Sequence, residues 1–94
     1  MIKVVQSNSD DPMLFNVTVQ EAGSETHHQV TMSNETYQDL TGGKVNPGRC
    51  IEAAFEFLLE REPKESILSS FDVTVISRYF PNFASEFDKY ISHS

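Results

Sequence analysis

The spacing of apolar residues changes in the middle of the chain, and this change predicts the order of the elements. Val30 and Met32 alternate with polar neighbours, as in a half-buried strand. Ile51, Phe55 and Leu58 then recur at the spacing of an amphipathic helix. A strand, a short helix, a turn and a long helix are therefore expected to follow one another.

The same alternation predicts an N-terminal antiparallel hairpin. Residues 15–20 alternate apolar and polar positions, and their expected partner is the alternation that ends at Met32. Residues 21–26 contain a glycine and a serine and form the expected hairpin loop. Residues 2–5 are a further short β segment, so the expected sheet has two or three strands.

Capping residues set the expected bounds of the first two helices. Ser33 or Asn34 can cap a helix over residues 34–40, which ends at a Gly-Gly turn. Asn46 followed by proline is a strong helix start, and this helix is expected to end near residue 62. The charged run that follows is interpreted as a solvated helix junction.

Short helices are expected in the C-terminal third. Residues 67–71 fit a turn and a half of helix, and Asp72 can cap the next segment. Residues 73–76 fit a helix or a strand, because periodicity does not distinguish the two in so short a run. Residues 83–91 predict a final helix.

Together these patterns predict one α+β domain over residues 1–94, with the hairpin packed against three to four short helices. The expected core consists of Phe15, Val17, Val19, Val30, Met32, Tyr37, Leu40, Ile51, Ala54, Phe55, Leu58, Ile67, Phe71, Ile76, Phe80, Phe83 and Phe87.

The acidic charge of the chain limits the kinds of molecule that it is expected to bind. The chain has 14 Asp and Glu against 7 Lys and Arg, a formal net charge of −7, and no basic cluster. General binding to nucleic acid or to anionic membranes is disfavoured, because both depend on Lys and Arg. No segment approaches the roughly 18 apolar residues of a membrane span, and no signal-peptide core is found, so a cytoplasmic location is expected.

Candidate catalytic and metal-binding residues are few. Cys50 follows Arg49 in the first turns of the long helix, where the helix dipole and the guanidinium can lower the pKa of a thiol. Free cysteine is nevertheless among the most buried residue types, so a packed, unreactive thiol is expected. His27 and His28 are adjacent in a strand and so point to opposite faces, and His93 lies at the chain end. No catalytic, cofactor or metal site is predicted, and the chain is expected not to be an enzyme.

An acidic stripe on the long helix is the candidate partner face. Glu52, Glu56 and Glu60 lie four residues apart and repel one another by about 0.2–0.5 kcal/mol per pair. The stripe is interpreted as a solvated face or as a docking surface for a basic partner. The leading hypothesis is a small acidic protein-interaction or regulatory module that binds another protein there or through an exposed aromatic near the C-terminus.

Element order over residues 27–62 resembles that of ribbon-helix-helix proteins. The similarity is carried by the segments Ser33-Asn34-Glu35-Thr36-Tyr37 and Ile51-Glu52-Ala53-Ala54. It implies a homodimeric DNA-binding repressor or antitoxin in which one strand from each subunit enters the major groove. The reading residues would be His27, Gln29 and Thr31. The chain departs from the family because residues 15–20 supply a partner strand internally and the reading face lacks Lys and Arg.

Residues 57–68 and 75–81 look like a set of short bacterial proteins of unknown function. This resemblance implies a bacterial cytosolic protein and lends it no activity. Within it, Tyr79 is interpreted as a core residue and Arg78 as the ion-pair partner of a nearby carboxylate.

Overall fold

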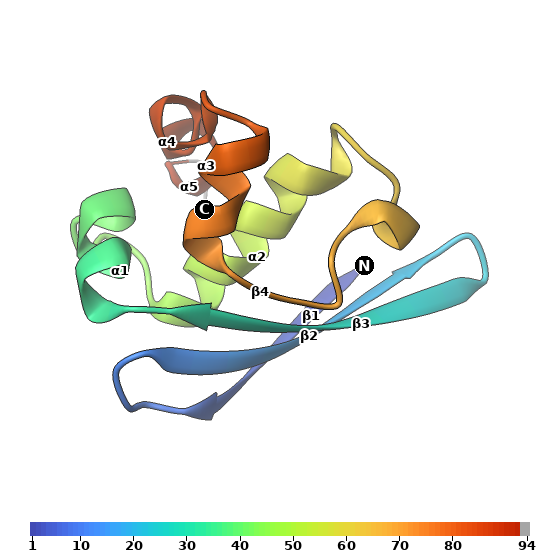
Figure 1. The fold of residues 1–94 in the computed structure, drawn as a ribbon, viewed down its shortest axis with the longest axis horizontal. Helices are drawn as coiled ribbons and strands as arrows, with labels where there is room; N and C mark the ends of the chain where they lie inside the picture. Colours follow the sequence, from blue (N-terminus) through green and yellow to red (C-terminus); the bar gives the residue numbers. More distant parts are fainter. Residues whose placement is uncertain (93–94) are drawn as a thin grey trace.

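The computed structural model describes residues 1–92, in which a four-stranded sheet carries all of the described helices on one face (Figure 1). The strand order is β1-β2-β3-β4, with the first three strands antiparallel and β4 parallel to β3. The strands are β1 (Ile2–Asn8), β2 (Met13–Glu21), β3 (Ser24–Met32) and β4 (Ser70–Asp72). The helices are α1 (Asn34–Thr41), α2 (Pro47–Leu59), α3 (Ile76–Tyr79), α4 (Phe83–Glu86) and α5 (Asp88–Ile91), with 3₁₀ turns η1 (Lys64–Ser66) and η2 (Val73–Val75). The predicted α+β class is confirmed.

The hairpin forms as predicted, but its loop is shorter. β2 and β3 continue to Glu21 and Ser24, leaving a two-residue turn at Ala22 and Gly23. Both turn residues have positive φ, 54° and 77°. A two-residue turn of this kind matches the twist of the paired strands, so the strands extend through most of the expected loop. The third strand, β1, is present and longer than residues 2–5.

Side-chain caps fix the starts of α1 and α2. Ser33 Oγ accepts a hydrogen bond from the Thr36 backbone N–H at 3.0 Å, and Asn46 Oδ1 accepts one from Arg49 at 2.8 Å. Gly42 ends α1 in the left-handed conformation, with φ 61°. These capping predictions are confirmed, although α2 ends at Leu59 and not near residue 62.

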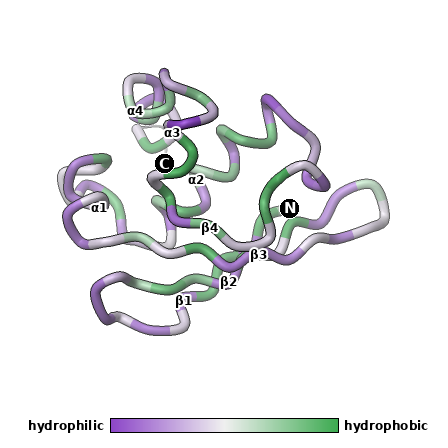
Figure 2. The backbone as a smooth tube through the Cα atoms, viewed as in Figure 1, coloured by the Kyte–Doolittle hydropathy of each residue, from purple (hydrophilic) through white to green (hydrophobic). Residues whose placement is uncertain are grey.

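The core lies between the inner face of the sheet and α2, and it extends beyond α2 to the C-terminal helices (Figure 1). Hydropathy along the chain agrees, since hydrophilic stretches lie at turns such as the one between β1 and β2 (Figure 2). Four expected core residues are only partly buried, namely Tyr37, Leu40, Phe71 and Phe80. Five buried hydrophobic residues were not expected in the core, namely Met13, Ala53, Phe57, Val73 and Ile91, whereas the packed thiol expected at Cys50 is confirmed.

The C-terminal third differs most from expectation. The helix predicted over residues 67–71 is wrong, because β4 occupies part of this segment and pairs with β3 from Gln29↔Ser70 to Thr31↔Asp72. Residues 73–76 are helical, as η2 and the start of α3. The predicted final helix is broken at Phe87 into α4 and α5.

Candidate functional site

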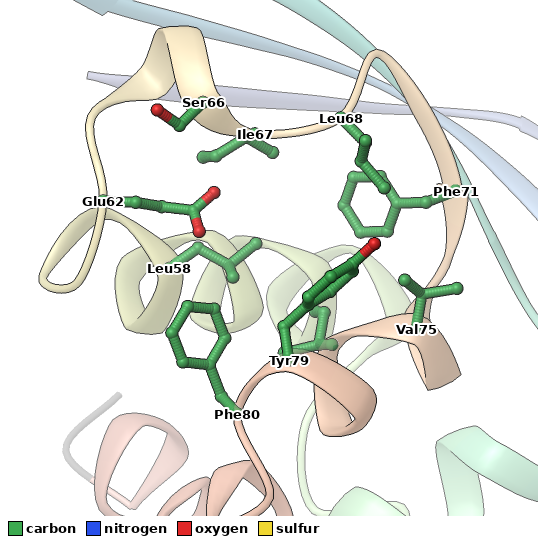
Figure 3. A pocket seen from close by; sticks show the side chains of 10 residues that line it. Leu58, Glu62, Ser66, Ile67, Leu68, Phe71, Val75, Tyr79 and Phe80 are labelled. Atoms are coloured by element: carbon green, nitrogen blue, oxygen red, sulfur yellow. The ribbon is translucent and has the colours of Figure 1, made fainter.

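An apolar groove opens where the C-terminal end of α2 meets η1, β4 and α3 (Figure 3). Its volume is about 270 Å³. Leu68 and Tyr79 are 47% and 67% exposed there, a high value for side chains of this size. The lining residues are Leu58, Glu62, Ser66, Ile67, Leu68, Phe71, Val75, Ile76, Tyr79 and Phe80. The groove therefore combines an apolar floor with exposed side chains that a partner can cover.

A buried histidine holds one wall of the groove in place. His28 is 4% exposed and packs its ring against Phe55, with 5.3 Å between ring centroids. Its Nδ1 lies 2.8 Å from the Leu68 carbonyl oxygen, and its Nε2 lies 2.8 Å from Thr26 Oγ1. A carbonyl only accepts, so Nδ1 carries the proton, and in the neutral ring Nε2 accepts from the threonine hydroxyl. The central sheet is thereby joined directly to the loop that carries Leu68.

Among the described residues, Glu62 is the one carboxylate that lines the groove. Its side chain extends into the groove between Leu58 and Ile67 (Figure 3). Burial beside these apolar side chains raises the pKa of Glu62 above its usual value. Within residues 1–92 its carboxylate receives no hydrogen bond and no ion pair, whereas neighbouring Glu65 is paired with Lys64 at 2.7 Å. The groove thus presents a partly desolvated negative charge for which the described part of the chain supplies no compensating cation.

The junction between α2 and η1 is less solvated than expected. Lys64 is 6% exposed, and its Nζ bonds Glu65. That bond, followed by a backbone hydrogen bond within Glu65, lowers the pKa of the Glu65 carboxyl. Tyr79, interpreted from the sequence as a core residue, is instead exposed at the groove, and that interpretation was wrong. Arg78 makes no ion pair within the described part of the chain, so its expected role is not observed.

The predicted acidic stripe is engaged within the chain itself. Arg49 donates to Glu52 at 2.9 Å and to Glu56 at 3.3 Å, and it also reaches the Tyr90 carbonyl oxygen at 2.7 Å. Glu60 accepts a hydrogen bond from the Tyr90 hydroxyl at 2.8 Å. All three carboxylates therefore contribute to holding α5 against α2, which reduces the negative charge they offer to a partner.

A second cation completes this contact between α2 and the C-terminal helices. The Arg61 guanidinium carbon lies 3.6 Å from the centre of the Phe57 ring. Its nitrogens also donate to the Tyr90 hydroxyl at 3.3 Å and to Glu86 at 3.2 Å. The stripe is thus part of an internal polar network between helices.

The three residues of the predicted DNA-reading strand lie on β3. His27 and Gln29 are exposed and Thr31 is half buried, on the face of β3 opposite the one that carries its buried side chains. At Gln29 and Thr31, β2 pairs with one edge of β3 and β4 with the other, and Thr31 Oγ1 donates to Asp72 at 2.6 Å. An intermolecular ribbon at these residues needs a free strand edge, and β4 occupies that edge.

The remaining candidate chemistry is buried or dispersed. Cys50 is 0% exposed, and burial raises the pKa of its thiol to about 12. His27 and His28 point to opposite faces, as predicted; His93 lies outside the described residues. Within residues 1–92 no group of three or more His, Cys, Asp or Glu side chains is placed to hold a metal ion.

Two findings place no further constraint on function. Over the described residues, no helix has the length and apolar character needed to cross a membrane. Comparison of the chain with protein-family models, with curated proteins and with solved structures gives no significant match.

Proposed function

We propose that this protein is a non-enzymatic protein-interaction module that binds a partner in the groove at Leu68 and Tyr79. The observation that carries this proposal is the Glu62 carboxylate, which has no partner within residues 1–92 and lies in a mainly apolar groove. Tyrosine is enriched among the side chains that dominate binding energy at protein interfaces. The groove's volume of about 270 Å³ is below the roughly 300–1,000 Å³ of small-molecule pockets. It suits one or two side chains of another protein.

Charge complementarity defines the expected partner. A Lys or Arg side chain that reaches Glu62 would supply the cation that the carboxylate lacks, and an apolar neighbour would cover Leu68 and Tyr79. The net charge of −7 favours encounter with a basic segment. The partner segment is therefore an apolar anchor residue with a Lys or Arg close to it in sequence. This surface replaces the acidic stripe of α2 as the proposed partner face.

A peptide selection tests this proposal. A random peptide library is selected on the intact protein and depleted on the Tyr79→Ala variant, which removes an exposed side chain. We expect the recovered peptides to combine an apolar residue with Lys or Arg. Calorimetry on one such peptide should show a Kd about tenfold higher for Glu62→Gln.

The matched control is Glu35→Gln, which removes the same charge from an exposed position on α1. Its Kd should equal that of the unmodified protein. Recovered peptides without basic residues, or equal Kd values for Glu62→Gln and the control, would contradict the proposal.

A further inference from the structure

The outer edge of β1 has backbone groups without partners in the sheet. Met1 and Gln20 exchange two hydrogen bonds, from the terminal amine to Gln20 O at 2.7 Å and from Gln20 N to Met1 O at 2.8 Å. Hydrogen-bonded and non-hydrogen-bonded pairs alternate along antiparallel strands. Lys3 and Val5 therefore bond to β2, while the N–H and C=O groups of alternate residues point to the open edge. Those residues are Ile2, Val4 and Gln6.

This edge has little of the protection that is usual at a sheet edge. β4, at the other end of the sheet, is three residues long. β1 has seven residues, contains no proline and carries Lys3 as its one charged side chain. Its only register irregularity lies between Gln6 and Asn8. Natural proteins commonly protect such edges with several charges, prolines or very short strands. An edge of this length and composition is suited to pairing with another strand.

We propose that β1 pairs antiparallel with β1 of a second copy, about a two-fold axis at Val4. This register places Ile2 opposite Gln6 of the other copy, and Val4 opposite Val4. The outward backbone groups of Ile2, Val4 and Gln6 then meet complementary groups on the other copy. Side chains on the inner face of one sheet stay on the inner face of the other. The two sheets continue as one.

The distribution of charged side chains favours a second copy of the chain as the partner of the open β1 edge. In this register Lys3 lies opposite Val5 of the other copy, so the two lysines do not face each other. Val5 is 51% exposed, and the aliphatic part of Lys3 would cover it. The first carboxylate in the chain is Asp10, beyond the end of β1. The negative charge of the protein is therefore absent from the strand that pairs.

Mass in solution tests the pairing. Light scattering after size exclusion, from about 1 μM to about 1 mM (the Kd range of weak association), should show growth from 10.6 kDa to twice that mass. Val5→Lys places a lysine opposite Lys3 of the other copy and should raise the dimer Kd at least about tenfold. Gln29→Lys makes the same charge change on the same sheet face of β3 and should leave the Kd unchanged.

Hydrogen exchange of the unmodified protein provides a second measurement that needs no variant. The amides of Ile2, Val4 and Gln6 should exchange more slowly as protein concentration rises. A chain that stays at 10.6 kDa throughout would overturn the proposal. A dimer whose β1 amides keep the same exchange rates, or one that Val5→Lys does not weaken, would overturn it as well.

Discussion

The adjacent histidines of β3 offer a direct test of how the groove is held. His28 is 4% exposed and bonds the Leu68 carbonyl oxygen, whereas the side chain of His27 is 70% exposed on the opposite face. We predict that His28→Leu destabilises the protein by about 2 kcal/mol. Leucine fills much of the ring's space but donates no hydrogen bond to the carbonyl.

The expected loss of stability follows from the groups that His28 contacts and that the leucine leaves without a hydrogen bond. A fully buried carbonyl that loses its donor costs about 1–3 kcal/mol, and the bond to the Leu68 carbonyl is part-buried, which places its loss within that range. The Thr26 hydroxyl is half buried and can bond water, so it adds little. The ring contact with Phe55, at 5.3 Å between centroids, is replaced by an apolar contact of similar kind. The carbonyl of Leu68 therefore accounts for most of the loss.

Urea denaturation followed by circular dichroism measures this loss. The midpoint for His28→Leu should fall by about 1–2 M, given an m-value of about 1–2 kcal/mol/M for a domain of this size. The control is His27→Leu, whose stability should stay within about 0.5 kcal/mol of the unmodified protein because its contacts are exposed. Equal midpoints for the two variants, or no change for His28→Leu, would refute the assigned role of His28.

Two further predictions concern Asp72 and Cys50. Burial raises the pKa of the Asp72 carboxyl, but the hydrogen bonds that it accepts from Thr31 and Thr74 together outweigh burial and lower the pKa below its usual value. Its contribution to stability is therefore present above the pKa of the unfolded chain, about 3.9, and is lost as pH falls through the lower folded-state value. Asp72→Ala should cost about 1–2 kcal/mol at pH 7 and should weaken this acid-dependent loss; an unchanged pH profile of unfolding would contradict the assignment. The Cys50 thiol is 0% exposed, and burial raises its pKa to about 12, so it should react with a thiol reagent only through opening of the fold; rapid labelling of the folded protein would show that it is accessible.

Most of the local elements of this protein could be predicted from patterns between neighbouring residues. Alternating apolar positions predicted the hairpin, and the caps at Ser33 and Asn46 predicted where α1 and α2 begin. These features depend on interactions between residues that are close in the chain. A capping hydrogen bond spans three residues, and strand alternation depends only on which side of the backbone each side chain occupies. The α+β class followed from these local elements.

The conformation of the C-terminal third and the position of the groove depend on contacts between distant segments. β4 is a strand because β3 offers it a partner some forty residues earlier in the chain, and local helical spacing gives way to that pairing. One face of α2 packs on the sheet. Phe57 lies on its other face and is buried because α3, α4 and α5 fold back over that face. Glu62 is brought into the groove, and Tyr79 to its exposed side, by the same arrangement. Such contacts join segments that are distant in sequence, so they cannot be predicted from the local pattern of residues.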